Sequence, residues 1–194
     1  MLRVVVLISG AGSNLLAFLE DCTAGMVPAA VVAVGSDVNA PGLAHARREG
    51  IPTFVEPLAM GEDRDAWGKR LGAMIESFTP DLVILSGFMK LLPASFVEHF
   101  APMILNTHPA YLPEFPGAHA VRDALQSGAT ETGASVIVVD AGIDTGPILA
   151  QSRVPIREDD TESSLHERIK TVERELLSTV VRDIASREDA VEGN

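Results

Sequence analysis

Asn106 and His108 are the residues whose types and spacing best suit acid–base chemistry. They stand two positions apart after an apolar run, so in extended chain their side chains point the same way. An amide can donate a hydrogen bond to a developing oxyanion, and an imidazole can exchange a proton near neutral pH. An asparagine before a turn and a single histidine can also be purely structural. The pair therefore predicts a pocket only together with its surroundings.

The residues after His108 predict a stiff loop. Pro109, Pro113, Pro116 and Gly117 occupy one short stretch. Proline fixes φ and lacks an N–H, so residues 109–117 can form neither a helix nor a central strand. We expect an irregular loop that leaves the end of a buried strand, which is where open α/β sheets bind ligands.

Asp144 is the third candidate, and it stands between Gly142 and Gly146. Aspartate and glycine are ordinary turn residues. The alternative is a carboxylate brought to His108, where it would stabilise the imidazolium or hold a water for proton relay. The sequence suggests neither a nucleophile nor a metal-ligand cluster. The set suits direct transfer between two bound substrates, in which an amine attacks a carbonyl, Asn106 and His108 stabilise the oxyanion, and His108 and Asp144 move protons.

A glycine-rich turn near the start predicts an anion site. The turn S-G-A-G-S-N at residues 9–14 follows a strand at 2–8 and precedes a helix from Leu15, with Ser13 or Asn14 as its N-cap. Free N–H groups and the helix dipole favour a phosphate there, on Gly12, Ser13 and Asn14. Leu15 stands where a dinucleotide fingerprint needs its third glycine. The glycines can also serve only the tight turn.

The elements that must position these groups alternate between strand and helix through residue 128. We predict strands at 2–8, 30–34, 50–55, 81–86, 103–105, 133–139 and 148–154, and helices from 15 and at 43–49, 63–78, 94–100 and 118–126, with a last helix capped by Asp159, Asp160 or Thr161. This order predicts an α/β fold with a doubly wound, mostly parallel sheet and an antiparallel strand near the C-terminus. The loops after the first, fourth and fifth strands should open on one rim. The apolar loop at 87–93 either plugs the sheet edge or walls a pocket for a flat ligand.

Composition limits the class of partner. The 194 residues indicate one domain over 1–194, with a polar, frayed tail at 186–194. A net charge of -12 gives no electrostatic footprint for nucleic acid or an anionic membrane. The single cysteine, Cys22, excludes an internal disulfide. The first apolar run mimics a short signal peptide, but no small-residue cleavage pattern follows it, so it indicates a buried strand. We therefore expect a cytoplasmic protein with small-molecule substrates, as a monomer or homodimer.

The motifs taken together resemble the phosphoribosylglycinamide formyltransferase family. The matching segments are 9–15, 87–89, 106–109, 112–119 and 144–147, in order and with ordinary spacing, within a resemblance covering residue 1 to about 177. Each motif is modest alone, whereas the ordered set is specific. The family has a Rossmann-like formyltransferase fold. Its reaction transfers a formyl group from the co-substrate 10-formyltetrahydrofolate to 5-phosphoribosylglycinamide in purine biosynthesis, without a metal.

The resemblance also implies roles for single residues. Asn106, His108 and Asp144 match the catalytic trio. The positions that match the ribonucleotide site are Gly12, Ser13, Asn14, Lys170 and Glu173. The positions that match the folate site are Arg64, Met89, Lys90, Leu91, Leu92, Asn106, Asp140, Ala141, Gly142, Ile143 and Asp144.

Some positions depart from the family. Many relatives carry histidine at Ile137, and often lysine at Glu114 and histidine at Arg174. These differences affect tuning of the site and ribonucleotide affinity rather than the reaction. His119 falls in a family motif, although it can simply cap a helix. His45, His99 and His166 match no family role.

Three other functions compete. Methionyl-tRNA formyltransferase resembles this core but must bind RNA through an added domain, which suits an acidic chain poorly. Formyltetrahydrofolate hydrolase uses water as the acceptor and has His-His where this chain has His108-Pro109. A non-catalytic nucleotide-binding domain would need the glycine turn but not the trio.

Overall fold

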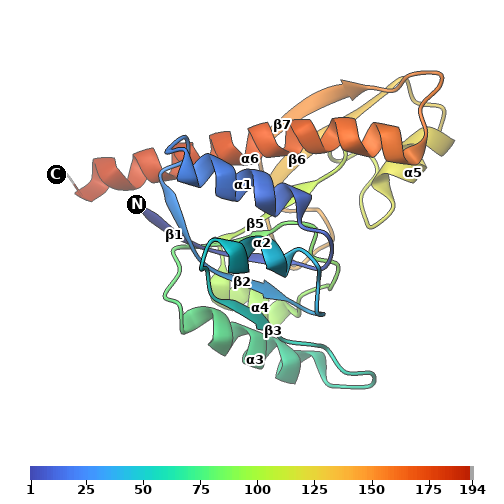
Figure 1. Cartoon of the computed structure of the whole chain (residues 1–194). Helices are drawn as coiled ribbons and strands as arrows, with labels where there is room; N and C mark the ends of the chain where they lie inside the picture. The colour runs from blue at the N-terminus through green and yellow to red at the C-terminus, as the bar shows by residue number, and fades with distance from the viewer. Residues whose placement is uncertain (193–194) are drawn as a thin grey trace.

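The computed structural model describes residues 1–192, which form seven strands and six helices (Figure 1). The strands make one sheet in the order β3-β2-β1-β4-β5-β6-β7. Their bounds are β1 Leu2–Ile8, β2 Ala29–Ser36, β3 Thr53–Val55, β4 Leu82–Leu85, β5 Ile104–His108, β6 Glu131–Val138 and β7 Ile148–Pro155. The helices are α1 Ser13–Thr23, α2 Leu43–Arg48, α3 Arg64–Glu76, α4 Ala94–Phe100, α5 Ala120–Gln126 and α6 Glu162–Glu192. The doubly wound α/β fold expected from the strand–helix alternation is confirmed.

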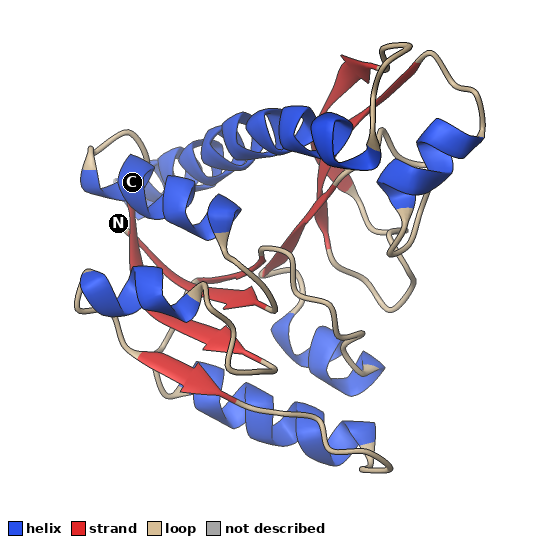
Figure 2. Ribbon diagram, turned by 45° about the vertical axis from the view of Figure 1, so that its right-hand side comes forward, coloured by secondary structure: helices blue, strands red, loops and turns tan. Residues whose placement is uncertain are grey.

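The central strand β1 is buried on both faces, and its alternate residues belong to two different cores. Val4 and Val6 pack under α1, α2 and α6, whereas Val5 and Leu7 pack against α3 and α4. Helices accordingly cover both sides of the sheet (Figure 2). A continuous apolar run is the pattern of such a strand. The parallel strands β1, β4 and β5 therefore all end on one rim.

Strand β6 is the one described strand that runs against the others. It is antiparallel to β5 and to β7. The expected antiparallel pairing of the last two strands is confirmed, and the reversal begins one strand earlier than the short 140–147 connection alone indicated. Alternate residues of β6 again separate: Ala134 and Val136 lie in the cores beside α6, and Gly133 and Ser135 face residues 110–112.

Several predicted boundaries are wrong for physical reasons. Strand β5 continues through His108, because Asn106 and His108 pair with Ile137 and Ser135 of β6. Their side chains therefore project from a sheet rather than from the loop. Helix α1 is capped by Gly12 in the left-handed conformation, and no side chain caps it.

Helix α6 differs from expectation at its far end. Thr161 accepts a hydrogen bond from the Ser164 amide, 3.1 Å from its Oγ1, which agrees with one of the three proposed caps. The tail expected to fray from residue 186 remains helical through Glu192, and residues 193–194 lie outside the described part of the chain.

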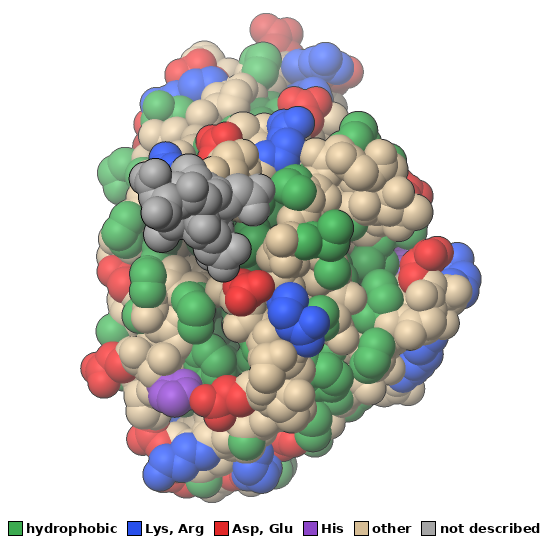
Figure 3. Space-filling model, turned by 90° about the vertical axis from the view of Figure 1, so that its left-hand side faces the viewer, with side chains coloured by type: hydrophobic (Ala, Val, Ile, Leu, Met, Phe, Trp, Pro, Cys, Tyr) green, Lys and Arg blue, Asp and Glu red, His purple; other side chains and the backbone are tan. Residues whose placement is uncertain are grey.

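The surface carries both signs of charge. Figure 3 views the end of the molecule where both termini lie, and acidic, basic and apolar side chains are interspersed there. None of the helices described is both long and apolar enough to cross a bilayer. Cys22 is half-buried in α1, and burial raises the pKa of its thiol to about 11, which agrees with a structural role.

Candidate active site

The rim where β1, β4 and β5 end opens on a cavity of about 570 Å³. Loops following these strands and one face of α6 line it. The lining includes every site residue expected from the sequence except one: Gly12, Ser13, Asn14, Met89, Lys90, Leu91, Leu92, Asn106, His108, Asp140, Ala141, Gly142, Ile143, Asp144, Lys170 and Glu173. Arg64 lies outside the lining, and its guanidinium donates a hydrogen bond to the Leu91 carbonyl.

The glycine turn is held by α2. Gly12 has φ +71°, and a Cβ built there would lie 3.0 Å from the Cα of Gly42. The Gly42 amide donates to the Gly10 carbonyl at 3.1 Å, and Nε2 of His45 donates to the Ala11 carbonyl at 3.1 Å. Only glycine combines this backbone conformation with so close an approach. The first N–H groups of α1 are thereby presented to the cavity, as an anion site requires.

Helix α6 is tied to this turn through Asn14. Its side-chain amide donates to Oε2 of Glu173 at 3.2 Å, and its carbonyl oxygen accepts from Nε of Arg174 at 2.9 Å. Glu173 is only 4% exposed, and burial raises the pKa of its carboxyl despite the hydrogen bond from Asn14. A protonated carboxyl there can both donate and accept, which suits recognition of hydroxyl groups. Lys170, one helical turn earlier, places an ammonium in the same lining.

His108 is held between two acceptors. Its Nε2 donates to the carbonyl of Phe115 at 2.9 Å, and its Nδ1 lies 3.4 Å from Oδ2 of Asp144. The same Asp144 oxygen accepts the Gly117 amide at 2.8 Å. Because Nε2 already carries a proton for the carbonyl, Nδ1 can donate to Asp144 only from the imidazolium. The Asp144 carboxylate thus faces the ring nitrogen that a second proton on His108 would occupy.

Asp144 is both a turn residue and a carboxylate beside His108. Asp144 has φ +54°, a conformation that aspartate tolerates better than most residues. A Cβ on Gly146 would lie 1.8 Å from the Val138 carbonyl oxygen, and one on Gly142 would lie 2.0 Å from Oγ1 of Thr145. The glycines let the β6–β7 connection turn back on itself, and this fold brings the carboxylate to His108.

Asn106 lies on the same side of β5 as His108 and lines the same cavity. It pairs with Leu85 of β4 on one side and with Ile137 of β6 on the other. Strand pairing on both edges fixes the backbone that carries the amide. The predicted neighbourhood of amide and imidazole therefore rests on a rigid sheet.

The segment 87–92 forms an apolar wall. Its Met89 amide donates to Oγ of Ser9 at 2.8 Å, and that hydroxyl donates to Oδ1 of Asp37 at 2.5 Å. Met89 and Leu91 are 71% and 58% exposed, and Ile143 across the mouth is 58% exposed. Apolar side chains gathered at a cavity mouth suit a ligand that covers them.

Several groups that line the cavity or bond His108 and Asp144 were not predicted from the sequence. The Phe115 carbonyl and the Gly117 amide are backbone groups, which leave no signal in residue type. His166 lines the cavity, and its spacing of four and seven from Lys170 and Glu173 could have indicated this. His119 precedes α5 without a side-chain capping bond and also lines the cavity. Among the described residues, no group of three or more His, Cys, Asp or Glu is placed to hold a metal.

Comparison with known proteins identifies the family of the chain. The family model described as "Formyl transferase" matches residues 2–181. A phosphoribosylglycinamide formyltransferase of Mycobacterium tuberculosis is 48% identical over 98% of this chain and 88% of its own length. The Escherichia coli protein of that name is 39% identical over 93% of this chain and 85% of its length.

Solved structures agree as well. Glycinamide ribonucleotide transformylase 1 of Symbiobacterium toebii superposes with a TM-score of 0.92 at 40% identity, covering 96% of this chain and 88% of that one. The family model spans nearly the whole described fold, including every strand and the rim that carries His108 and Asp144. The chain belongs to the formyl transferase family.

Proposed function

We propose that this chain transfers the formyl group of 10-formyltetrahydrofolate to the amine of 5-phosphoribosylglycinamide, giving 5-phosphoribosyl-N-formylglycinamide and tetrahydrofolate in de novo purine biosynthesis. One observation carries the proposal. A single cavity joins a helix N-terminus suited to phosphate, a buried His108–Asp144 pair and an apolar mouth. Both substrates can therefore meet at His108. A relative named phosphoribosylglycinamide formyltransferase matches 98% of this chain at 48% identity.

The reaction proceeds by direct attack. The amine nitrogen of the ribonucleotide bonds to the formyl carbon, and a tetrahedral oxyanion forms. The Asn106 amide donates a hydrogen bond to that oxygen, and the positive charge of protonated His108 is its second stabiliser. The attacking nitrogen loses a proton, the bond from the formyl carbon to the folate nitrogen breaks, and the folate nitrogen gains a proton.

His108 and Asp144 handle these protons, since Nδ1 of His108 lies 3.4 Å from Oδ2 of Asp144. Gly12, Ser13 and Asn14 hold the phosphate, while Lys170 and Glu173 meet the rest of the ribonucleotide. Binding both substrates in one cavity supplies much of the acceleration, because it makes the encounter intramolecular.

The cavity and the net charge also indicate the class of partner. A cavity of about 570 Å³ suits small-molecule substrates, and the acidic chain suits neither nucleic acid nor an anionic membrane. We place the protein in the cytoplasm as a single domain, either a monomer or a homodimer. Size-exclusion chromatography with light scattering decides between the two assemblies.

The test is an absorbance assay of folate deformylation with phosphoribosylglycinamide added or withheld. We expect conversion only when the amine is present. His108→Ala and Asp144→Asn should each reduce the rate by about a hundredfold or more, whereas the exposed control variants His99→Ala and Asp123→Asn should retain it. Deformylation that ignores the amine would point to the hydrolase, and no turnover in either condition would refute the proposal.

A further inference from the structure

The residues 110–117 carry two backbone groups that touch the catalytic pair. The Phe115 carbonyl accepts from Nε2 of His108, and the Gly117 amide donates to Oδ2 of Asp144. Phe115 has φ +50°, which is unfavourable for a bulky side chain. Such a conformation persists only where the surroundings hold it. The position of the imidazole therefore depends on what anchors this segment.

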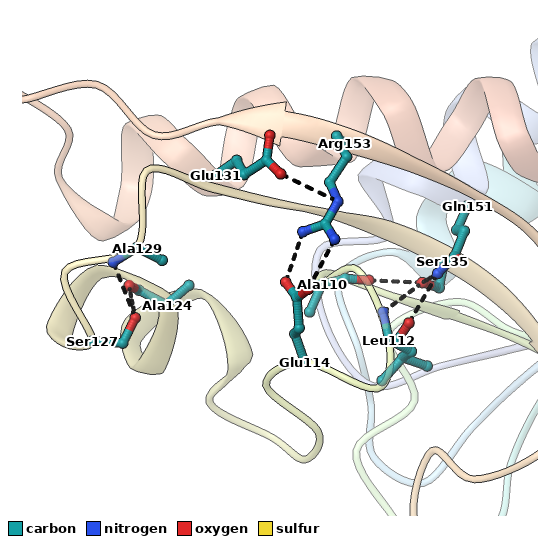
Figure 4. Close-up of polar contacts among 10 residues, drawn as sticks. All are labelled: Ala110, Leu112, Glu114, Ala124, Ser127, Ala129, Glu131, Ser135, Gln151 and Arg153. Carbon is teal, nitrogen blue, oxygen red and sulfur yellow. Dashed lines mark hydrogen bonds and ion pairs between the residues drawn. The ribbon is translucent and has the colours of Figure 1, made fainter.

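One face of the β6–β7 hairpin provides the inner anchors (Figure 4). The Ser135 hydroxyl donates to the Ala110 carbonyl at 2.8 Å and accepts from the Leu112 amide at 3.1 Å. The side-chain amide of Gln151 donates to the Leu112 carbonyl at 3.0 Å. Ser135 and Gln151 are paired across the two strands, so both project to the same side.

Arg153 provides the outer anchor. Its two terminal nitrogens donate to the two carboxylate oxygens of Glu114, at 2.8 and 2.9 Å (Figure 4). Its Cζ lies 3.7 Å from the centre of the Tyr111 ring, and its Nε lies 3.4 Å from Oε1 of Glu131. A two-point fork fixes direction as well as distance, and stacking on an aromatic ring fixes the guanidinium plane.

The sheet is shaped to receive this arrangement. Gly133 pairs with Arg153, and a Cβ built on Gly133 would lie 2.9 Å from the Cβ of Tyr111. A larger residue there would collide with Tyr111 and also with the Ser152 carbonyl oxygen, which lies 2.3 Å from the same Cβ.

We propose that Arg153 and Gln151 are positioning residues for the transfer reaction. Through Glu114 and Leu112 they hold the 110–117 segment so that its carbonyl and amide keep His108 and Asp144 in register. Both residues lie outside the cavity lining. Arg153 and Glu114 have side chains 38% and 40% exposed, and ion pairs this exposed contribute little to stability. The fork therefore acts through the position of the 110–117 segment rather than through stability. The inference rests on the proposed function only in the test that measures turnover.

The experiment compares Arg153→Met and Gln151→Met with Arg70→Met. Arg70 is a matched control, because it also bonds two carboxylates, those of Glu56 and Glu62, at 46% side-chain exposure and away from the cavity. We expect kcat to fall about tenfold in the two test variants, with both KM values changed less than twofold, since sub-ångström misplacement of a catalytic group costs rate rather than binding. The swap Glu114→Arg with Arg153→Glu should recover at least half of the loss.

A second measurement needs no turnover. The ¹⁵N resonances of the His108 ring should move in Arg153→Met and Gln151→Met but not in Arg70→Met, with ligand absent. This result would support the anchoring even if the proposed substrates prove wrong. Unchanged His108 resonances in both test variants, or an equal fall of kcat in Arg70→Met, would overturn the inference. Arg153→Lys, which keeps the charge and loses the fork, should behave like Arg153→Met.

Discussion

Replacing Gly12 with alanine tests the anion site, because α1 supplies its own control. Gly12 and Gly25 flank this helix, and both have φ +71°. A Cβ on Gly25 would meet nothing within 4 Å, whereas one on Gly12 would lie 3.0 Å from the Cα of Gly42 and 3.4 Å from Cδ2 of His45. The two variants therefore share the backbone strain and differ in the contact.

The expected magnitudes follow from these distances. Left-handed backbone costs an alanine about 1–2 kcal/mol, and reduced freedom of the unfolded chain returns about 0.4–1 kcal/mol. Gly25→Ala should thus lose about 0.5–1 kcal/mol. Contact with the Gly42 backbone, which cannot rotate away, adds about 1–2 kcal/mol of overpacking. Gly12→Ala should lose about 1.5–3 kcal/mol, which lowers the Tm by about 3–12 °C in a chain of this size.

Function should separate the two variants further. Relief of the contact moves the first N–H groups of α1, so the KM for the ribonucleotide should rise about tenfold in Gly12→Ala, an order-of-magnitude loss typical of a disturbed charged contact. The KM for the folate should change little, and Gly25→Ala should match the parent in both. Urea denaturation and steady-state kinetics measure these quantities. Equal stability losses in the two variants, or an unchanged ribonucleotide KM in a destabilised Gly12→Ala, would refute the reasoning.

Three further predictions concern titration and packing. Burial raises the pKa of Glu173 in the folded protein, so the stability contributed by this carboxyl is full below pH 4.5 and is lost as the pH rises. In urea titrations at pH 5 and 8, Glu173→Gln should therefore lose less stability between the two pH values than the parent does. Ribonucleotide binding should weaken in the same variant. Hydrogen bonds from Arg168 hold the pKa of Asp160 well below its usual range, so the stability this carboxylate provides is present above about pH 4 and falls in acid. Asp160→Asn should therefore be destabilised at neutral pH and approach the parent near pH 2, as followed by circular dichroism. Trp67 is fully buried and donates from Nε1 to the Glu56 carbonyl at 3.0 Å; Trp67→Phe should cost about 1–3 kcal/mol in urea denaturation, and a loss below 0.5 kcal/mol would contradict the role given to that bond.

The order of strands and helices was accessible from sequence because it depends on local pattern. Val4 to Leu7 read as a strand buried on both faces, and the structure places them between two cores. The predicted helix at 63–78 corresponds to α3, in which Trp67 and Leu71 are buried and Met74 is 38% exposed. Boundaries failed where pairing with a distant strand extended an element, as β6 does for β5.

The site residues also differ in whether local sequence pattern or a distant contact determines their position. The spacing of Asn106 and His108 follows from strand geometry and needs no tertiary information. The glycine turn before α1 is equally local. Lys170 and Glu173 had no signal of their own, because their place in the cavity depends on Asn14 meeting a residue 159 positions later in the chain.

By itself the sequence determined which groups could do chemistry and which of them share a strand or a turn, since periodicity and glycine conformation act over a few residues. Only the tertiary structure decided that Asp144 lies beside His108, that the Phe115 carbonyl accepts from the imidazole, and that Arg153 bonds Glu114 in the 110–117 segment. Those contacts arise from reversal of β6 and from sheet packing, where the free energy comes from burial and pairing of distant segments. The residue type at one position does not predict which distant residues it will contact.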